Sequence, residues 1–499
     1  MTTITKEQVA RAVYDAIPRI ACVLPCDVRA ALEDAQAAEG DTRGAVVLGH
    51  LLENADIAER DHVPICQDTG TVWVCLEAGP DVSVPGDVFA CVDDAVARAY
   101  TEARLRKSVV RDALVDRANT GDNTPAFTDI HFVDTPGARV HVLLKGGGSD
   151  NASRVTMLTP GAGREGIIAE VMDCVAHKAA NACPPLVIGI GVGGTFDKVA
   201  GMAKSALLRE VGTPAADHRV AEFERELLDK VNASGMGPGA LGGKTLALAV
   251  HVNTAPCHIA ALPLAINMGC SAMRRATVEL DVAASVAWPP AEEPGESASD
   301  AAACAETSCE EDAHEMGSSA HEAAPIKLTL PLDKTELAKL KAGDACVLTG
   351  EMYMLRDAGH IRLLEELEAQ GALPYGLDGA TIFYAGPTPA AAGRPFGAVG
   401  PTTASRMDFA APALYRAGVV ATVGKGVRSA DVAEACQETG SVYFVATGGA
   451  AALLAQRVES GEVVAYDDLG TEALRRITVS DFPVFVGLDT RGGNVYDLQ

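Results

Sequence analysis

Aromatic residues are scarce in this chain: they make up 4% of its 499 residues, and Trp occurs at two positions. Hydrophobic residues as a whole still reach 48%, so Ala, Val, Leu and Gly must do most of the packing in a globular core. Long apolar runs are also lacking, since none reaches the roughly 18 residues that a membrane-spanning helix needs. The first residues show no apolar segment typical of a secretory signal, so we expect a cytoplasmic protein with no membrane partner.

Positive charge is also in short supply. The chain has 41 Lys and Arg residues against 67 Asp and Glu residues, and its formal net charge is −26. Such a surface repels nucleic-acid phosphates and anionic membranes, so neither is an expected partner. An anionic small molecule would have to bind at a local cluster of Arg and Lys side chains that overcomes the overall negative field.

One segment, 289–325, lacks the large apolar side chains that a hydrophobic core requires. Residues 289–325 are rich in acidic residues, contain no Lys or Arg, and have almost no large apolar side chain, a composition typical of a solvated linker. This segment would separate an N-terminal domain, 1–288, from a C-terminal domain, 326–499. In both parts, strand-like apolar runs alternate with helical patterns, which predicts an α/β fold that is richer in strand in the C-terminal part.

Cysteine, by contrast, is plentiful, with 13 residues in a chain that shows no export signal. An odd number in a cytosolic setting argues against a disulfide framework and leaves free thiols, metal ligands or cluster ligands. Cys66 ends the strand-like run VPIC and begins the polar run CQDTG, whereas Cys183 and Cys270 lie in NACPP and INMGC. Their wide separation carries no ligand signature, and an isolated Cys is more often a small buried apolar residue.

Two glycine-rich segments follow strand-like runs. Gly189–Gly194 fits the pattern G-x-G-x-x-G, but a dinucleotide site would need a second strand ending in an acidic residue, and the residues that follow are helical. The glycine motif has two other interpretations: a tight turn between a strand and a helix, or a helix N-terminus whose amides bind a carboxylate. Lys145–Ser149 contains three consecutive glycines, and such a segment by itself is more often a loop than a site.

Three cations stand out in the C-terminal part. Arg356, Arg406 and Lys425 each lie in a loop or near the end of a strand-like run. Each alone would be an ordinary surface charge. Together, in an acidic protein, they suggest a site for a carboxylate.

These segments, taken together, resemble the iron–sulfur-dependent (class I) fumarase and L-tartrate dehydratase family, with the α- and β-type parts fused in one chain. The similarity runs nearly end to end and is carried by long segments such as ENADIAERDHVPICQDTG, KGGGSDNASRVTMLTPGAG, HIAALPLAINMGCSAMRRA and YAGPTPAAAGRPFGAVGPTTASRMD. It implies a larger N-terminal α/β domain that carries a cluster and a smaller, strand-rich C-terminal domain of the swivelling type. It also implies a homodimer.

The resemblance assigns three irons of a [4Fe–4S] cluster to Cys66, Cys183 and Cys270. The fourth iron would have no protein ligand, and its open position would let it act as a Lewis acid on the substrate. Cys304 and Cys309, within the predicted linker, would have no part in the site.

The resemblance also implies roles for polar residues. The substrate-binding residues would be Gln67, Arg106, Gly148, Arg356, Arg406 and Lys425, and the catalytic residues Thr402, Asp68 and His258. Asp68, alone or together with His258, would act as an acid near the leaving hydroxyl group. Thr402 would act as the base that removes the proton from carbon. A Thr hydroxyl needs strong local activation for that role. Arg111 lies close to Arg106 in the sequence and competes for its assignment.

The implied reaction is the reversible hydration of fumarate to (S)-malate. Tartrate and methyl-substituted dicarboxylates remain alternative substrates, because one small group changes binding by only about 1–3 kcal/mol. Other classes of protein would use fewer of these features. An iron–sulfur redox sensor would need no carboxylate-binding cations, a nicotinamide dehydrogenase would use Gly189–Gly194, and a non-catalytic carboxylate-binding protein would need no cysteines.

Overall fold

The computed structural model describes residues 2–281, 286–290 and 324–498. Most of the predicted linker, 291–323, lies outside the described residues. Within the described ranges the chain is a mixed α/β protein, as the sequence predicted. No helix in these ranges has both the length and the apolar content to span a bilayer.

Helices begin the N-terminal part and line one side of it. The first, α1, is capped by Thr5, whose hydroxyl accepts a hydrogen bond from the Gln8 N–H while the Gln8 side chain accepts one from the Thr5 N–H. The helices of this part are α1 (Lys6–Cys22), α2 (Cys26–Glu39), α3 (Arg43–Asp61), α4 (Val92–Glu102), α5 (Gly147–Asp150), α6 (Gly163–Lys178), α7 (Phe196–Ala206) and α8 (His218–Asn232).

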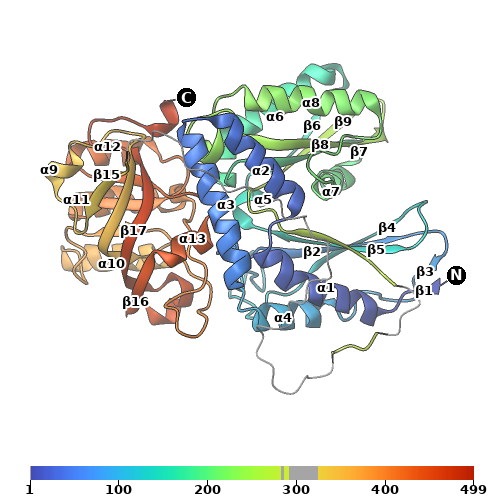
Figure 1. Cartoon of the computed structure of the whole chain (residues 1–499), viewed down its shortest axis with the longest axis horizontal. Coiled ribbons are helices and arrows are strands. Elements are labelled where there is room, and N and C mark those ends of the chain that lie inside the picture. The colour runs from blue at the N-terminus through green and yellow to red at the C-terminus, as the bar shows by residue number, and fades with distance from the viewer. Residues whose placement is uncertain (1, 282–285, 291–323, 499) are drawn as a thin grey trace.

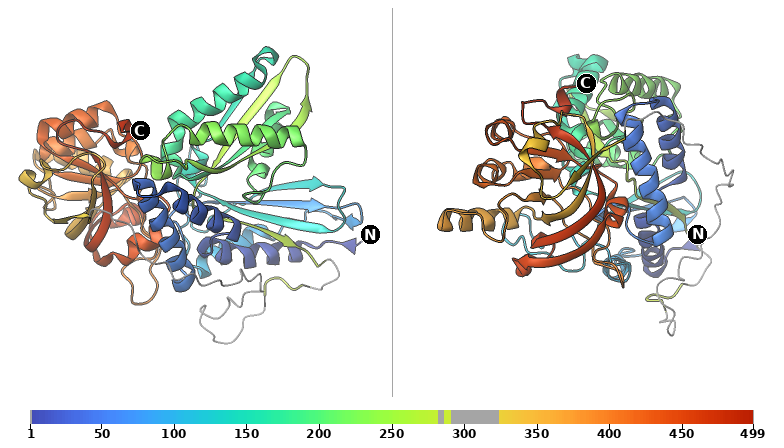
Figure 2. Two further views of the ribbon diagram at one scale, coloured as in Figure 1. Left: turned by 45° about the horizontal axis from the view of Figure 1, so that its top comes forward. Right: turned by 60° about the vertical axis from the view of Figure 1, so that its left-hand side comes forward.

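Two four-stranded sheets form the rest of the N-terminal part. The first has the strand order β10 (Arg275–Glu279), β5 (Ala138–Lys145), β2 (Thr71–Ala78), β4 (Phe127–Phe132). The second has the order β6 (Arg154–Leu158), β9 (Leu262–Gly269), β7 (Leu186–Gly194), β8 (Ala247–Cys257). The short strands β1 (Thr2–Thr3) and β3 (Val82–Ser83) pair with each other. The two larger sheets diverge from the side on which the C-terminal part lies (Figure 1; Figure 2, left).

Alternation along β2 shows how the first sheet is covered. Val72, Val74 and Leu76 are fully buried on one face and pack in a cluster with residues of α1 and α4. The edge strand β4 is different, because all six of its residues are exposed, including Phe127 and Phe132. This edge therefore leaves apolar side chains open to solvent.

The segment Gly189–Gly194 forms the end of strand β7. A Cβ atom at Gly189 would lie within clash distance of the Ala203 carbonyl oxygen, and one at Gly191 would meet that of Val199. The glycines therefore let α7 pack directly on the strand. Gly193 and Gly194 have φ of 89° and 68°, and α7 begins at Phe196 directly after the N-cap residue Thr195, so the motif ends in the tight strand-to-helix turn that was one of its interpretations.

The C-terminal part contains a small closed sheet. Strands β12 (Ala345–Met354), β13 (Thr381–Phe383), β14 (Ala421–Gly424) and β15 (Val442–Val445) pair in parallel, and β17 (Leu474–Leu488) pairs antiparallel with both β15 and β12. Strands β11 (Ile326–Thr329) and β16 (Val458–Ala465) extend it. The helices are α9 (Lys334–Leu337), α10 (Ala358–Gln370), α11 (Ala411–Ala417), α12 (Ala430–Thr439) and α13 (Ala451–Gln456). The strand-rich C-terminal part expected from the sequence is confirmed.

Helix α3 lies between the two parts (Figure 1), and its buried residue Asn54 joins them. The Asn54 amide nitrogen donates to the carbonyl oxygens of Ile65 and Gly449, at 3.1 and 3.0 Å. Its oxygen accepts from the N–H groups of Ala452 and Leu453, at 2.7 and 3.0 Å. The Asn54 side chain thus supplies hydrogen-bond partners for two N–H groups at the start of α13 and also binds the residue that precedes Cys66.

We predict that Asn54→Ala lowers the free energy of unfolding by roughly 2–4 kcal/mol, because buried N–H and C=O groups lose their partners. Thermal and urea unfolding of the full chain would measure the loss. Glu53→Ala is the control, since it removes only an exposed ion pair of 3.7 Å with Arg457 and should cost less than about 1 kcal/mol. Equal effects of the two variants would contradict the role of Asn54.

Candidate active site

Strand register brings two of the three predicted cluster cysteines together. Strand β7 pairs antiparallel with β9 so that Val187 lies opposite Gly269, which places Cys183 and Cys270 at the same end of the sheet. The Ser271 N–H donates to the Cys183 carbonyl oxygen at 3.1 Å. Cys183 itself has φ 59°, in the left-handed region that a residue with a side chain adopts only when its surroundings impose it.

The third cysteine, Cys66, faces the same space from the loop between α3 and β2. The run VPIC, read as a strand in the sequence, is irregular here, and this loop carries Cys66 and Gln67. Burial raises the pKa of the Cys66 thiol to about 11, and the thiols of Cys270 and Cys183 act in the same direction. The three sulfurs are therefore close enough to influence one another.

The donor set fits a cluster better than a single ion. Among the described residues, no three His, Cys, Asp or Glu side chains converge on one metal position. In a cluster, each thiolate binds a different iron, so the sulfurs surround the group without meeting at a point. Three thiols from separate segments would each bind one iron of such a cluster, the set that would leave one iron open.

Lys425 carries a positive charge from the C-terminal part to these thiols. It follows β14, and its Nζ lies 2.6 Å from the Cys183 Sγ. Glycines make the approach possible, because a Cβ at Gly148 would lie 3.3 Å from this Nζ and one at Gly448 would lie 2.5 Å from the Cys183 Sγ. Burial lowers the pKa of Lys425, but the neighbouring thiols, Cys183 first, raise it above its ordinary value.

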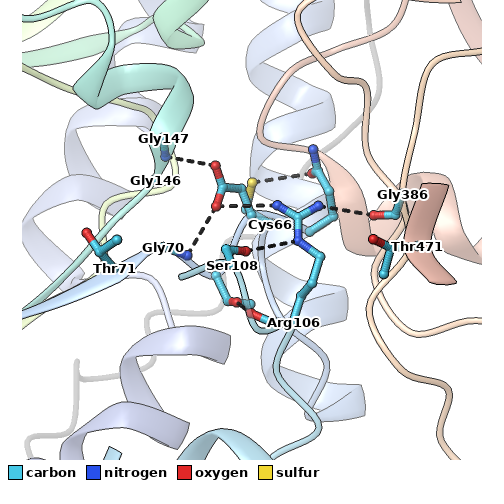
Figure 3. Close-up of polar contacts among 12 residues, drawn as sticks. Cys66, Gly70, Thr71, Arg106, Ser108, Gly146, Gly147, Gly386 and Thr471 are labelled. Atoms are coloured by element: carbon cyan, nitrogen blue, oxygen red, sulfur yellow. Dashed lines mark hydrogen bonds and ion pairs between the residues drawn. The ribbon is translucent and has the colours of Figure 1, made fainter. Parts of the chain in front are cut away.

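Asp68 lies beside the glycine-rich segment 145–149, because β2 begins opposite the end of β5, with Thr71 paired to Lys145. Its carboxylate accepts hydrogen bonds from the N–H groups of Gly147 (2.8 Å) and Gly70 (3.2 Å) and lies 3.4 Å from Arg106 Nη2 (Figure 3). This segment therefore orients a carboxylate rather than a phosphate.

Two buried arginines face each other across Gly386. Arg106 donates to the Gly386 carbonyl oxygen at 3.3 Å and to Ser108 at 3.3 Å (Figure 3). Arg356 lies on the other side, where a Cβ at Gly386 would be 2.7 Å from its Nε. Burial, followed by the charge of Arg106, lowers the pKa of Arg356 to about 10, and its buried Nε has no hydrogen-bond partner among the described residues. Two such guanidinium groups together are suited to bind an anion.

Gln67 and Thr402 come together at the border of the two parts. The Gln67 amide donates to the Pro401 carbonyl oxygen at 3.3 Å. The next residue, Thr402, is buried, and its N–H donates to the Tyr384 carbonyl oxygen at 2.7 Å while its own carbonyl accepts from the Lys425 N–H at 3.1 Å. The backbone around Thr402 is therefore held on both sides.

Two predicted site residues lie apart from this group. Arg406 is half exposed, and its Nε and Nη2 both donate to the carboxylate of Asp357, the residue after Arg356. His258 is exposed in the turn between β8 and β9, at the end of these strands opposite to Cys270, and its Nδ1 accepts from the Ala260 N–H. A single chain does not bring His258 to Asp68.

The structure also adds a residue that the sequence reasoning missed. Arg274 is buried, and its Nη1 donates to the Asp68 carbonyl oxygen. Its signal in the sequence was a pair of adjacent arginines shortly after Cys270 in an otherwise acidic chain.

An ionised carboxylate among buried cations, next to three converging thiols, defines an enzyme site for a small anion. Comparison with known proteins agrees: the family model described as fumarate hydratase (Fumerase) matches residues 10–279, and the fumarase C-terminus model matches residues 299–499. The chain belongs to the fumarate hydratase family and is a hydro-lyase. The family expected from the sequence is thereby confirmed.

Individual relatives show the same similarity. The chain is 32% identical over 489 residues to "Fumarate hydratase class I, anaerobic" of Escherichia coli (strain K12), which covers 94% of this chain and 85% of the relative. It is 31% identical over 483 residues to "Fumarate hydratase 1, mitochondrial" of Leishmania major, with 94% and 85% covered. It is 37% identical over 276 residues to "Putative L(+)-tartrate dehydratase subunit alpha" of Methanocaldococcus jannaschii, with 54% of this chain and 96% of the relative covered.

The surroundings of Asp68 predict how stability depends on pH. Burial raises the pKa of its carboxyl, but Arg106, Arg274, the Gly147 N–H and Lys425 together lower it below its usual value. The ionised form therefore stabilises the fold above about pH 4, and this contribution is lost as the pH falls through the folded-state pKa. The stability difference between the wild type and Asp68→Asn should be constant between about pH 5 and pH 8 and shrink below about pH 4.

Urea unfolding at a series of pH values would measure this difference. In an Arg106→Gln background the pH-dependent part should be smaller, because the first of the cations that lower the pKa of Asp68 is gone. A difference that stays constant down to about pH 3 would contradict the prediction.

Proposed function

We propose that this enzyme reversibly hydrates fumarate to (S)-malate, and that Cys66, Cys183 and Cys270 hold a [4Fe–4S] cluster at which the hydroxyl group is gained or lost. The observation that carries the proposal is the convergence of these three thiols with the buried pair Arg106 and Arg356 in a chain of the fumarate hydratase family. When bound, the cluster would supply a Lewis acid at the iron that has no thiolate ligand.

The cations account for carboxylate binding. Arg106 and Arg356 present two guanidinium forks at one place, and Lys425 adds an ammonium on the side of the thiols. Loss of a proton next to a carboxylate places further negative charge on that group. Positive groups that are already in position stabilise this charge without reorganisation.

We assign Asp68 to proton transfer at the hydroxyl and Thr402 to proton transfer at carbon. In the free site Asp68 is ionised, because the surrounding cations lower its pKa. A dicarboxylate bound at Arg106 adds negative charge beside it, which raises the pKa of Asp68 toward that of a proton donor. Thr402 follows Pro401, which binds Gln67, and its backbone pairs with Lys425, so its position relative to the cations is fixed.

We further propose a cytoplasmic homodimer in which 1–288 and 326–499 are the two domains and 289–325 is the linker. No disulfide is present among the described cysteines, which suits a reducing compartment. Exposed apolar side chains gather on the edge strands and on the β8–β9 turn: Phe127, Phe132, Val155, Met157 and Ile259. His258 lies beside Ile259 in this turn, at the end of β9 opposite to Cys270, so a role for it in the reaction requires a second copy of the chain.

Tartrate is the second candidate substrate, because of the similarity to the putative L(+)-tartrate dehydratase subunit. An assay of the anaerobically reconstituted enzyme with fumarate, (S)-malate, L-tartrate and methyl-substituted dicarboxylates would decide. Fumarate and malate should give the highest kcat/KM. A preference for tartrate would replace the proposed substrate and leave the hydro-lyase class unchanged.

We predict that Cys66→Ser, Cys183→Ser and Cys270→Ser each lose the cluster and most of the activity, since an alcohol is a poor substitute for an iron-binding thiolate. Iron and sulfide per chain after anaerobic reconstitution, with a hydration assay, would measure both. Cys257→Ser, at an exposed cysteine outside the site, should retain both. Full iron content in Cys183→Ser would overturn the ligand assignment.

Arg406 gives a separate test of carboxylate binding. We predict that Arg406→Met costs about 2–5 kcal/mol in kcat/KM, because it leaves the Asp357 carboxylate, beside Arg356, without its closer cation, and that Arg406→Lys is only a partial rescue because Lys lacks the planar fork. Arg416→Met is the control, because Arg416 is equally exposed and is paired with a carboxylate, Glu438, at 2.8 Å. A loss of less than about threefold in Arg406→Met would place Arg406 outside the site.

A further inference from the structure

Arg274 is a buried cation that the proposed reaction does not use. It is 2% exposed and directly precedes β10, where the register with β5 pairs Arg275 with Leu143. The Leu144 N–H donates to the Arg274 carbonyl oxygen at 3.0 Å. Because this backbone is held by the sheet, the position of the Arg274 side chain is set by the fold rather than by a flexible loop.

The contacts of Arg274 satisfy its hydrogen-bonding groups only in part. Its Nη1 donates to the Asp68 carbonyl oxygen, and its Nη2 lies against Gly146, where a Cβ would be 3.2 Å away. Its Nε is buried and has no hydrogen-bond partner among the described residues. Among the described residues Arg274 makes no ion pair with a carboxylate, and the Asp68 carboxylate pairs instead with Arg106 at 3.4 Å. A buried guanidinium nevertheless needs a negative neighbour.

The negative neighbour of Arg274 is the Asp68 carboxylate, and Cys66 and Cys270 would become negative as thiolates when they bind metal. Burial lowers the pKa of Arg274, but Cys66, Cys270 and Asp68 raise it above its ordinary value. The effect is mutual, because Arg274 is the first of the groups that lower the pKa of Cys66. Lys425 contacts the sulfur of Cys183 and is the first of the groups that lower the pKa of this thiol. Lys425 also acts more weakly on Cys66 and Cys270, so both cations contribute positive charge to the three thiols.

We propose that Arg274 is a positioning residue of this site, which holds the segment from Cys66 to Asp68 against Gly146 and balances the negative charge of the Cys66 and Cys270 thiolates. The inference rests on the proposed function, in which these thiolates bind the cluster. A buried positive charge beside the thiolates favours the more negative, reduced form of the group that they hold, so Arg274 should raise its reduction potential and slow its oxidation.

The next residue provides a matched control. Arg275 is also buried, but its guanidinium lies 2.5 Å from the Asp27 carboxylate and donates to the carbonyl oxygens of Leu208 and Arg209. Its charge is therefore neutralised away from the thiols. Replacing Arg275 removes a buried guanidinium from the same backbone segment without removing charge from the site.

The test compares Arg274→Gln, Arg274→Lys and Arg275→Gln in the full chain after anaerobic reconstitution with iron and sulfide. Arg274→Gln should lower the midpoint potential of the cluster, and its visible absorbance should bleach in air roughly threefold faster, or more, than that of Arg275→Gln. Arg274→Lys should recover part of both effects, because it keeps the charge. Equal potentials and bleaching rates in Arg274→Gln and Arg275→Gln would overturn the proposal, whatever happens to activity.

A second measurement does not depend on the cluster. In the metal-free chain, hydrogen exchange of the backbone in 66–70 and 146–148 should be faster in Arg274→Gln than in the wild type, whereas Arg275→Gln should act on 207–211. If the wild type takes up no iron, the proposed function fails, and exchange still decides the positioning role. Unchanged exchange in 66–70 in Arg274→Gln would overturn that role.

Discussion

A cation that is buried in a protein must lie beside an anion, because its lost hydration is otherwise not replaced. The site of this enzyme is organised by that requirement. Lys425 lies on the Cys183 sulfur, and Arg106 lies beside the Asp68 carboxylate. Arg356 is compensated less closely, because its Nη2 lies 3.5 Å from a Glu472 carboxylate oxygen and its Nε lies 3.9 Å from one of Asp357. Its Nε has no hydrogen-bond partner among the described residues, and its pKa is lowered to about 10. A dicarboxylate would add negative charge at closer range, so substrate binding would complete the compensation of this guanidinium.

Glycine determines how closely these charges can approach. At Gly386 and Gly448, a methyl group would collide with Arg356 and with Cys183 respectively. Gly448 thereby lets backbone of the C-terminal part lie directly against Cys183 of the N-terminal part, and Gly386 leaves room for Arg356 beside the carbonyl oxygen that accepts from Arg106. The site therefore exists only where the two parts meet, and neither part contains a complete set of cations and thiols.

The interface that makes this possible is itself polar. Asn54 uses both its oxygen and its nitrogen to bind backbone groups of α13, Gly449 and Ile65, and Ile65 directly precedes Cys66. Four buried hydrogen bonds on one side chain specify a single arrangement of the segments that they join. Docking of the C-terminal part and placement of the Cys66 loop are thus coupled through one residue.

Local patterns in the sequence determined the fold class, the early helices and the strand-rich C-terminal part, because helical and strand periodicities are properties of neighbouring residues. Long motifs determined the family and singled out the three cysteines, which spacing alone had not. Tertiary structure decided the rest. It placed Gly189–Gly194 inside a strand, left VPIC irregular, separated His258 from Asp68 and added Arg274. These outcomes depend on sheet register and on burial among residues far apart in the chain, which no local pattern encodes.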